Sequence, residues 1–433
     1  MKITVVGAGY VGLVTGACFA ELGNDVICVD IDEEKIKKLN NNIMPIYEPG
    51  LDQIVKRNRN EKRLVFTTDL KDSIKRSEIV FICVGTPPKD NGEADLSYVE
   101  NVARTIAEVM DSYKVIVEKS TVPVQTGEDV SKTIKAYNRH KVDFDVVSNP
   151  EFLREGSAVS DFMNPDRVVI GCESEKARQI MKNLYKPLKA PILFTDIKSA
   201  EIIKHASNSF LATKVSFINA IANICELAGA DVEKVAEGMG LDKRIGRPFL
   251  NAGIGYGGFC FPKDSEAFIR IAEKLGYDFK LLKATQEINN WQRKHFARKI
   301  EKALWVVKGK TIGVLGLAFK PDTDDMRFAP SIDIIKALQK EGAKIQAYDP
   351  EAMEKARNML KDIVYSNNPY DAAKDADALI IVTEWGEFKE LDMQKIKKLM
   401  KHHLIIDGRN IYNPGDMKKL GFRYISMGRK EVA

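Results

Sequence analysis

The first thirty residues constrain the fold of this chain more than any other segment. A β-branched run at residues 2–6 is followed by Gly7-Ala8-Gly9-Tyr10-Val11-Gly12, a helical stretch to residue 22, and a second apolar run that ends before Asp30. Strand, GxGxxG, helix, strand and acidic residue, in this order and at this spacing, are typical of the dinucleotide-binding unit of doubly wound α/β folds. A lone GxGxxG would be weak evidence, but the full context predicts a dinucleotide site.

This unit also predicts which dinucleotide is bound. The glycines allow a tight turn and let a pyrophosphate sit on the N-terminus of the following helix. Asp30 is expected to accept hydrogen bonds from the adenosine ribose hydroxyls and to repel a 2′-phosphate. The sequence therefore favours NAD over NADP.

Three further predicted strands end in polar, turn-rich segments. The strands are expected at residues 78–84, 114–118 and 144–147, and they lead into Gly85-Thr86-Pro87-Pro88, Lys119-Ser120-Thr121-Val122-Pro123 and residues 148–156. Each segment alone could be an ordinary loop. Because the carboxyl ends of parallel strands meet at one edge of the sheet, where ligands dock in open α/β folds, together they favour a site.

A glycine-rich segment at residues 251–264 precedes a cysteine. Four glycines, Gly253, Gly255, Gly257 and Gly258, lie within six residues shortly before Cys260. Glycine lets a backbone approach a ligand closely, so we expect a ligand-binding loop here, closed by Pro262-Lys263-Asp264 before a helical pattern. The thiol could act as a covalent nucleophile. The alternative is a tight turn with a buried cysteine, which is the commoner situation for a lone cysteine.

A long helical pattern occupies residues 199–227. Its length predicts a helix that joins two domains and favours a dimer surface. Lys204 and Asn208 are four residues apart, so one helix face presents an ammonium and a carboxamide together. An exposed polar pair is more often structural than chemical, but these two groups could stabilise an oxyanion. Further helices are predicted at residues 231–239 and 279–304.

The C-terminal third repeats the α/β pattern. Strands are predicted at residues 310–315, 343–348, 378–382 and 404–406, and the glycine fingerprint is incomplete because Gly316 is followed by Ala318 and Phe319. This indicates a second nucleotide-binding type of fold that binds something other than a dinucleotide pyrophosphate. Lys320 and Arg409 are candidate charge partners, although Lys320 could equally be a surface lysine.

Composition excludes several classes of protein. The 433 residues suggest two or three domains, and a net charge of +5 with Lys and Glu interspersed does not indicate nucleic-acid binding. Six cysteines without a CxxC pair favour reduced thiols and argue against a zinc site or a disulfide framework, and the five histidines have no metal-ligand spacing. No uninterrupted apolar run reaches the roughly 18 residues of a membrane span. We expect a cytoplasmic protein that holds no metal and associates with neither a membrane nor nucleic acid.

With these segments assembled, the chain resembles the UDP-glucose 6-dehydrogenase family along essentially its whole length. The matching motifs are GAGYVG, residues 119–123, residues 149–156, Lys204 with Asn208, Arg244-Ile245-Gly246, residues 260–264, Phe319-Lys320 and Asp407-Gly408-Arg409. One departure is Gln125, where many relatives carry glycine, and it affects the fine shape of that loop. The resemblance implies an NAD-binding Rossmann domain at residues 1–196, a central helical dimerisation domain at 197–300 and a Rossmann-like UDP-sugar-binding domain at 301–433.

The resemblance also implies a reaction. The family oxidises the primary alcohol of a nucleotide sugar to a carboxylate with two NAD⁺, which for UDP-glucose gives UDP-glucuronate and two NADH. Cys260 would hold the aldehyde as a thiohemiacetal, and the second oxidation would convert this adduct into a thioester that water hydrolyses. Lys204 and Asn208 would stabilise oxyanions, and Lys204 would help deprotonate the alcohol. Thr121 and Asp264 would position water, with Glu151 as general base.

Ligand contacts follow from the same motifs. Residues that match the family's cofactor contacts are Gly7, Gly9, Tyr10, Val11, Gly12, Asp30, Lys35, Thr86, Ser120, Thr121, Glu155, Lys263 and Arg327. Residues that match the sugar-nucleotide site are Glu151, Phe152, Leu153, Lys204, Asn208, Arg244, Phe249, Asn251, Gly253, Gly255, Gly257, Phe319, Lys320 and Arg409. In relatives, the equivalent of Arg244 reaches into the partner subunit's site, which implies a homodimer or a higher oligomer.

Three alternatives stay open at the level of sequence. Relatives with the same three-domain plan oxidise UDP-N-acetylmannosamine or GDP-mannose, although residues 149–156 and Arg244-Ile245-Gly246 resemble the UDP-glucose branch. A two-electron hydroxyacid dehydrogenase of the 6-phosphogluconate type would need neither Cys260 nor a third domain. A catalytically silent NAD-binding regulator would have no use for the intact set of Cys260, Lys204, Asn208 and Asp264.

Overall fold

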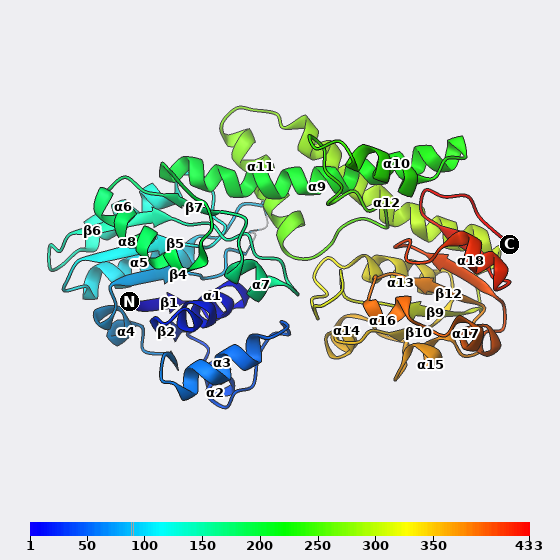
Figure 1. Cartoon of the computed structure of the whole chain (residues 1–433), viewed down its shortest axis with the longest axis horizontal. Helices are drawn as coiled ribbons and strands as arrows, with labels where there is room; N and C mark the ends of the chain where they lie inside the picture. Colours follow the sequence, from blue (N-terminus) through cyan, green and yellow to red (C-terminus); the bar gives the residue numbers. More distant parts are fainter. Residues whose placement is uncertain (88, 90) are drawn as a thin grey trace. The chain divides into compact units, whose positions relative to one another are not determined.

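The computed structural model describes residues 1–87, 89 and 91–433; Pro88, which the sequence places in a turn after a strand, lies outside the described residues. The chain divides into two compact units. The first contains residues 1–207 and 266–277, and the second contains residues 208–265 and 278–433. Each unit contains one sheet, and the divisions fall within helix α9 (Ile197–Ala228), within helix α11 (Cys260–Lys274) and between residues 277 and 278 (Figure 1). The three domains with boundaries near residues 196 and 300 stay a prediction.

The sheet of the first unit has the order β3-β2-β1-β4-β5-β6-β7-β8. Its first six strands are parallel, whereas β7 pairs antiparallel to β6 and parallel to β8. The order 3-2-1-4-5-6 is that of the doubly wound dinucleotide fold, so the predicted fold class is confirmed. The strands are β1 (Lys2–Val6), β2 (Asp25–Val29), β3 (Leu64–Thr67), β4 (Ile79–Ile82), β5 (Lys114–Glu118), β6 (Phe144–Ser148), β7 (Val168–Gly171) and β8 (Ile192–Thr195).

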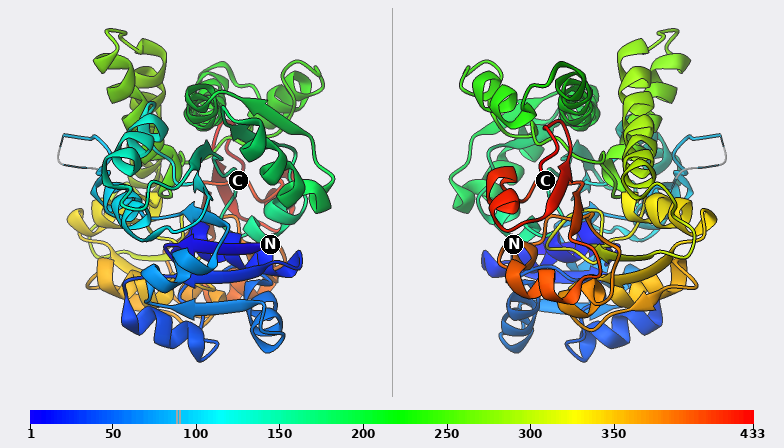
Figure 2. Two further views of the ribbon diagram at one scale, coloured as in Figure 1. Left: turned by 90° about the vertical axis from the view of Figure 1, so that its left-hand side faces the viewer. Right: turned by 90° about the vertical axis from the view of Figure 1, so that its right-hand side faces the viewer.

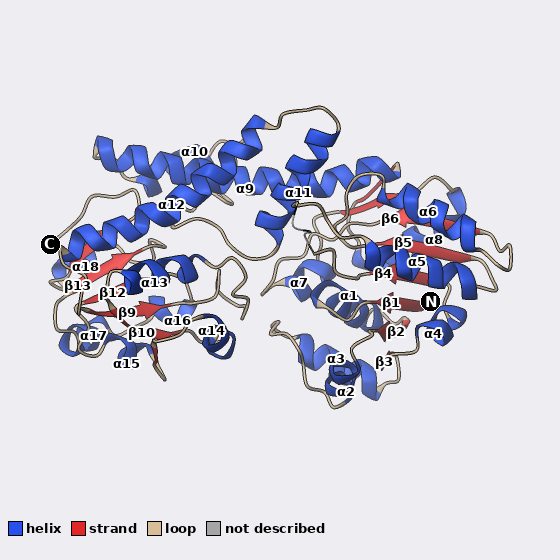
Figure 3. Cartoon of the chain, turned by 180° about the vertical axis from the view of Figure 1, so that it is seen from behind, coloured by secondary structure: helices blue, strands red, loops and turns tan. Residues whose placement is uncertain are grey.

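Helices cover both faces of this sheet, because its central strands are apolar on both sides. In β4, Ile79 and Phe81 pack into one core with helices α1, α3, α7 and α8, while Val80 and Ile82 pack into another with α5 and α6. Figure 3 labels these helices beside the strands, and Figure 2 shows the same N-terminal part of the chain, in blue to green, from two further sides. The helices are α1 (Tyr10–Glu21), α2 (Glu33–Asn40), α3 (Leu51–Asn60), α4 (Leu70–Arg76), α5 (Ser97–Val109), α6 (Thr126–Tyr137), α7 (Ala158–Met163) and α8 (Glu175–Tyr185).

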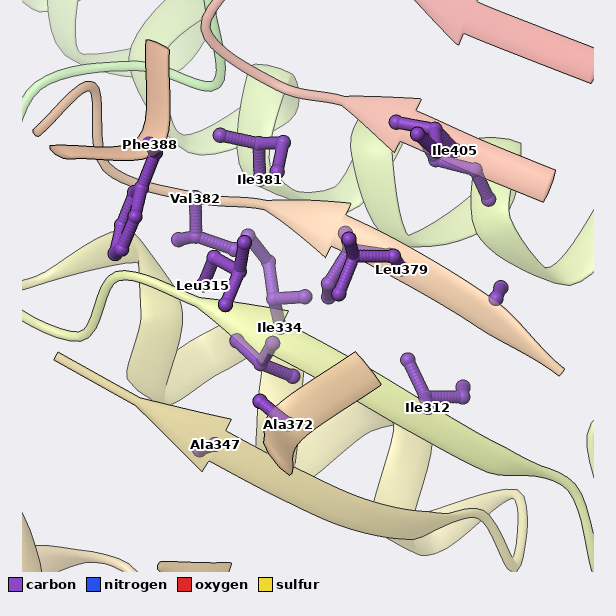
Figure 4. Close-up of a cluster of buried hydrophobic side chains, with 14 of the residues drawn as sticks. Ile312, Leu315, Ile334, Ala347, Ala372, Leu379, Ile381, Val382, Phe388 and Ile405 are labelled. Atoms are coloured by element: carbon purple, nitrogen blue, oxygen red, sulfur yellow. The ribbon is translucent and has the colours of Figure 1, made fainter. Parts of the chain in front are cut away.

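The second unit contains a parallel sheet of order β11-β10-β9-β12-β13-β14. Its core includes Ile312, Leu315, Leu379 and Ile381 from neighbouring strands, with Phe388 from a helix, as Figure 4 shows. The strands are β9 (Thr311–Leu315), β10 (Lys344–Tyr348), β11 (Val364–Tyr365), β12 (Ala378–Ile381), β13 (Leu404–Asp407) and β14 (Arg423–Ser426). The helices are α13 (Pro330–Lys340), α14 (Met353–Met359), α15 (Pro369–Ala373), α16 (Gly386–Lys389), α17 (Met393–Leu399) and α18 (Pro414–Lys419).

Four helices connect the two sheets along the sequence: α9 (Ile197–Ala228), α10 (Val232–Gly240), α11 (Cys260–Lys274) and α12 (Lys280–Leu304). The predicted long helix is confirmed as α9. Among the described helices, α9 alone is long and apolar enough to cross a membrane by length and composition, with a mean hydropathy of 1.3 over 18 residues. The core helix of a soluble protein meets the same criterion, and α9 carries the buried charged residues Glu201 and Lys204.

The structure corrects the expected end of the glycine-rich loop. The sequence predicts Pro262-Lys263-Asp264 in the loop, but α11 begins at Cys260 and includes all three residues. Pro262 fits there because the first turn of a helix has no intrahelical partner for its N–H groups, so a proline loses nothing. Cys260 and Asp264 are therefore one turn apart on one helix, and Cys260 stands at the helix N-terminus, where an anion is favoured.

Candidate active site

The fingerprint glycines form a cradle in the first unit. Gly7 has φ +100°, and a Cβ at this position would lie 2.6 Å from the carbonyl oxygen of Cys83. A Cβ at Gly12 would lie 1.8 Å from the carbonyl oxygen of Gly7, so packing within the protein requires both glycines. At Gly9 nothing lies within 4 Å of the added Cβ. Gly9 thus leaves open space at the N-terminus of α1, which fits a bound pyrophosphate.

Asp30 follows β2 and lies beside this cradle. Its carboxylate accepts a hydrogen bond from the backbone N–H of Ala8 at 2.8 Å and another from Lys35 Nζ at 2.8 Å. The fingerprint loop and the predicted ribose-binding carboxylate are therefore joined directly. The side chain of Asp30 is 10% exposed and that of Lys35 is 28% exposed. This donor and acceptor set fits the adenosine half of a dinucleotide.

The loops after β4 and β5 are tied to each other. Thr86 donates to the carbonyl oxygen of Thr121 at 2.9 Å, and the Ser120 hydroxyl donates to the carbonyl oxygen of Val84 at 2.8 Å. The backbone N–H of Ser120 donates to the buried carboxyl of Glu118, whose pKa burial raises to about 8. The three predicted residues Thr86, Ser120 and Thr121 thus belong to one bonded cluster, as the strand-end argument anticipated.

A buried ion pair lies in the segment after β6. Lys204 Nζ, from α9, contacts Glu151 Oε1 at 2.8 Å, and the two side chains are 4% and 5% exposed. The other carboxylate oxygen of Glu151 accepts from the N–H of Leu153 at 2.6 Å. Phe152 lies between two cations, with its ring centroid 5.5 Å from Lys204 Nζ and 3.7 Å from the Arg167 guanidinium carbon. A paired ammonium and carboxylate of this kind can exchange a proton and stabilise an oxyanion.

A polar network that the sequence analysis missed holds the start of this segment. Asn149 accepts hydrogen bonds from the Tyr185 hydroxyl at 2.5 Å and from Lys119 Nζ at 3.2 Å, and its amide donates to the carbonyl oxygen of Val169 at 2.8 Å. Burial lowers the pKa of Lys119 to about 8. The presence of Lys119 in the Lys-Ser-Thr motif gives no indication that its side chain points into the core.

In the second unit, Asp264 organises the start of α11. Its carboxylate accepts from the amide of Asn208 at 2.7 Å and contacts Lys263 Nζ at 2.9 Å, and Asp264 is 1% exposed. Cys260, one turn earlier, is half-buried. The structure therefore places a thiol, a carboxylate, a carboxamide and an ammonium on two neighbouring helical segments of this unit. The N-terminus of a helix favours a thiolate as nucleophile.

The glycine-rich loop is packed tightly against its own unit. A Cβ at Gly257 would lie 2.4 Å from the carbonyl oxygen of Phe328, and Gly255, at φ +95°, would place one 2.7 Å from Asn289 Oδ1. Gly253 likewise leaves no room for a side chain, since its Cβ would lie 2.9 Å from the carbonyl oxygen of Gly408. The close approach that we predicted for a ligand is thus made to the protein's own groups, and ligand contacts of these glycines stay a prediction.

Arg409, after β13, gathers three loops of the second unit. Its guanidinium donates to the carbonyl oxygens of Val382 at 2.8 Å, Gly255 at 3.2 Å and Phe319 at 3.3 Å. It also contacts Glu384 at 3.2 Å. Arg409 therefore holds together the loops of the predicted substrate residues Gly255 and Phe319. This is a structural role beside its predicted role as a charge partner.

The C-terminal fold differs from the first at the acidic residue that follows its second strand. Asp349 follows β10 as Asp30 follows β2, but it is fully buried and accepts from the backbone N–H groups of Leu317, Ala318 and Ala352 at 2.7 to 3.0 Å. The indole of Trp385 donates to it at 3.1 Å. With its oxygens satisfied internally, Asp349 is not available to a ribose, which gives a physical reason for the predicted loss of dinucleotide binding.

The remaining predicted residues lie in the second unit. Arg327 and Lys263 both stack on the ring of Phe259, at 4.3 and 5.3 Å from its centroid. The ring of Phe249 lies 6.2 Å from that of Phe261, and Arg247 donates to Asn251 at 2.7 Å. The side chain of Arg244 is 89% exposed and pairs with Asp242. Among the residues that the structure describes, no group of three or more His, Cys, Asp and Glu side chains is arranged to hold a metal ion.

The predicted residues divide between the units. The first unit holds the fingerprint residues Gly7, Gly9, Tyr10, Val11 and Gly12, with Asp30, Lys35, Thr86, Ser120, Thr121, Glu151, Phe152, Leu153, Glu155 and Lys204. The second holds Asn208, Arg244, Phe249, Asn251, Gly253, Gly255, Gly257, Cys260, Lys263, Asp264, Phe319, Lys320, Arg327 and Arg409. The fold and these groups define an NAD-dependent dehydrogenase with a second, modified nucleotide-binding domain.

Comparisons with known proteins agree along the whole chain. Residues 1–189 match the NAD binding domain of the UDP-glucose/GDP-mannose dehydrogenase family, residues 198–291 match its central domain, and residues 313–414 match its UDP binding domain. The chain belongs to the UDP-glucose/GDP-mannose dehydrogenase family. Its predicted cofactor, NAD, and its predicted status as an oxidoreductase are thereby confirmed.

Individual relatives cover nearly the full length. The chain is 54% identical to UDP-glucose 6-dehydrogenase TuaD of Bacillus subtilis (strain 168), over 100% of this chain and 94% of the relative. It is 49% identical to UDP-glucose 6-dehydrogenase of Rhizobium meliloti (strain 1021), over 100% of both chains. Among solved structures, a UDP-glucose dehydrogenase from Pyrobaculum islandicum superposes with a TM-score of 0.92 at 38% identity, over 99% of this chain and 98% of that one.

Proposed function

We propose that this protein oxidises UDP-glucose to UDP-glucuronate with two NAD⁺ and one water, through a covalent adduct on Cys260. The observation that carries the proposal is the arrangement at the start of α11, where Cys260 precedes by one turn an Asp264 held by Asn208 and Lys263. A two-electron oxidation stops at the aldehyde and needs no thiol, whereas the acid requires a second oxidation of a tetrahedral adduct.

Gly9 and Asp30 would hold NAD⁺, which would supply the hydride acceptor for two successive oxidations, one NAD⁺ molecule for each. Between these two events, the sulfur of Cys260 bonds to the aldehyde carbon and the aldehyde oxygen takes up a proton, which gives a thiohemiacetal. Loss of hydride and proton leaves a thioester. Water then adds to its carbon, the C–S bond breaks, and the carboxylate and the thiol are released.

The polar side chains share the acid–base and oxyanion tasks of this sequence. The Lys204 ammonium, paired with Glu151, stabilises the oxygen as it becomes an oxyanion, and the pair takes the alcohol proton. The amide of Asn208 is oriented by its bond to Asp264 and is assigned to the same oxyanion. Asp264 and Thr121 position the hydrolytic water, and Glu151 is its general base.

The names of the most similar relatives support UDP-glucose, rather than another nucleotide sugar, as the substrate of this protein. Those at 54% and 49% identity are named UDP-glucose 6-dehydrogenases, whereas the UDP-D-ManNAc dehydrogenase of Pyrococcus horikoshii is 31% identical, with a TM-score of 0.87. The test is an absorbance assay at 340 nm with a panel of nucleotide sugars and both cofactors. We expect UDP-glucose and NAD⁺ to give the highest kcat/KM, and UDP-N-acetylmannosamine or GDP-mannose as the better substrate would overturn the assignment.

We further propose that the protein forms a homodimer through α9. Phe210, Phe217 and Ile224 recur every seven residues, so they lie along one helix face, and they are 65%, 47% and 58% exposed. An apolar stripe of this length on a soluble enzyme favours a partner surface. The exposed Arg244 is the residue that the family resemblance assigns to the partner's site. Light scattering should give twice the chain mass, and Phe217→Glu should give monomers; a monomeric unmutated protein would contradict the proposal.

A cytoplasmic location accompanies this function. The five buried cysteines, Cys18, Cys28, Cys83, Cys172 and Cys225, are free thiols. Reduced thiols are typical of the cytosol, where nucleotide sugars and NAD⁺ are also found. Cell fractionation should recover the protein with cytosolic markers, and recovery with the membrane pellet would contradict this location.

A further inference from the structure

Glu48 is a buried carboxylate that the sequence motifs did not reveal. It lies in the turn Tyr47-Glu48-Pro49-Gly50 before α3 and is 5% exposed. Burying a carboxylate costs free energy unless its oxygens are hydrogen-bonded. The partners of Glu48 therefore indicate what it does.

Three donors from two distant segments converge on Glu48. The Tyr10 hydroxyl donates to Oε2, the N–H of Gly156 donates to the same oxygen at 2.7 Å, and the N–H of Ala158 donates to Oε1 at 2.7 Å. The N–H of Gly156 also lies 3.2 Å from the Tyr10 hydroxyl oxygen. One side chain thus joins the dinucleotide fingerprint, which contains Tyr10, to the end of the segment at residues 151–156.

That segment carries groups for both halves of the reaction. At its start, Glu151 is held by Lys204 and by the N–H of Leu153. At its end, Gly156 has φ +81°, and Glu48 is the carboxylate that binds its N–H. Glu155, between these two anchors, matches a cofactor contact. The Lys204 ion pair therefore fixes the start of the segment, at Glu151, and Glu48 fixes its end, at Gly156.

The tyrosine keeps its proton in this arrangement. Burial, followed by the hydrogen bond to Glu48, raises the pKa of Tyr10 far above its ordinary value. The hydroxyl thus remains a donor to Glu48 over the whole working range of pH.

We propose that Glu48 is a positioning residue for the oxidation: its carboxylate holds Tyr10 and the segment at residues 151–156 in one arrangement, so that the NAD⁺ site and Glu151 are set together. This inference rests on the proposed function, because the segment matters through the reaction that it serves. Catalytic groups must be held to within fractions of an ångström, and small misplacements cost rate.

The test uses three variants: Glu48→Gln, Tyr10→Phe and the double variant that carries both changes. The control is Asp52→Asn, which removes an exposed carboxylate from nearby α3. Glutamine keeps the volume of Glu48 but loses one acceptor oxygen. We expect Glu48→Gln to raise the Kd for NAD⁺, titrated without sugar, about tenfold and to lower kcat by a similar factor. The double variant should lose little more than Glu48→Gln alone, since both changes break one joint contact. Asp52→Asn should match the unmutated protein.

Three results would overturn the inference. The first is a Glu48→Gln protein that is thermally destabilised but has the Kd and kcat of Asp52→Asn. The second is fully additive losses in the double variant. If Glu48→Gln does not fold, Tyr10→Phe carries the test. The third result that would overturn the inference is then a Tyr10→Phe protein with an unchanged Kd for NAD⁺. Failure of the proposed function would show differently, as absence of UDP-glucose turnover in the unmutated protein with NAD⁺ binding intact.

Discussion

Replacing Arg409 should weaken the sugar-nucleotide site without affecting the NAD⁺ site. Arg409→Met removes hydrogen bonds to three backbone carbonyls, those of Val382, Gly255 and Phe319, and leaves these acceptors without their donor. Hydrogen bonds to a charged group contribute roughly 1.5–3 kcal/mol each. The two longer bonds, at 3.2 and 3.3 Å, are the ones that hold the predicted substrate loops, so we count about 1.5 kcal/mol for each.

Without these two bonds the loops must be ordered when the sugar nucleotide binds, so about 1.5–3 kcal/mol of binding free energy is lost. This corresponds to a rise in the KM for UDP-glucose of about 10- to 150-fold, since each 1.4 kcal/mol is a factor of ten. Arg409→Lys should recover only part of the loss, because an ammonium cannot span three carbonyls. The control is Arg357→Met, which removes an exposed arginine from α14 of the same sheet domain.

The assay is steady-state kinetics in which each substrate is varied at saturation of the other. The KM for NAD⁺ should stay within about twofold of the unmutated value, because the fingerprint glycines and Asp30 belong to the other unit. An unchanged KM for UDP-glucose would refute the reasoning. A rise in the KM for NAD⁺ alone would mean that the two nucleotide folds had been assigned the wrong ligands.

Three further predictions concern single side chains. Asp30→Ala should narrow the preference for NAD⁺ over NADP⁺, measured as the ratio of kcat/KM values, and equal values in the unmutated protein would contradict the role of Asp30. Lys204→Met should lower kcat by at least about a hundredfold with a smaller change in KM; an intact kcat would exclude Lys204 from the chemistry. Although burial opposes it, bonding to His295 and Lys299 lowers the pKa of Glu226 to about 2. The corresponding contribution to the free energy of unfolding, about 3 kcal/mol, is present above pH 4.5 and lost as pH falls toward 2. When the pH is lowered over this range, the urea midpoint of Glu226→Gln should therefore fall less than that of the unmutated protein.

The sheets could be predicted from sequence because their strands carry strong local signals. Residues 2–6 and 25–29, flanked by the fingerprint, became β1 and β2 with the predicted bounds. The short strands β3 (Leu64–Thr67), β7 (Val168–Gly171), β8 (Ile192–Thr195), β11 (Val364–Tyr365) and β14 (Arg423–Ser426) were not predicted, because none has a motif beside it. Strand β7 pairs antiparallel through a single residue pair, Ser148 with Gly171, which no local pattern specifies.

The site was predictable as residue types but not as contacts. The motifs indicated Lys204 and Glu151 separately, yet their pairing depends on where α9 meets the loop after β6. Glu48 and Lys119 were missed because a charged residue is expected at the surface, and only tertiary packing buries it. The N-terminus of α11 at Cys260 was missed because Pro262 indicates a loop, although proline is tolerated in a first helical turn.

The most direct test of the covalent mechanism is the ratio of NADH released to UDP-glucose consumed, measured for the unmutated protein and for Cys260→Ser. The unmutated protein should release two NADH per sugar with no free aldehyde, because the adduct stays on Cys260. Cys260→Ser should fold and bind both ligands but fail to turn over to free acid, since a serine hydroxyl is a poorer nucleophile than a thiolate and an ester hydrolyses more slowly than a thioester. One NADH per sugar, or an unchanged kcat in Cys260→Ser, would contradict the mechanism.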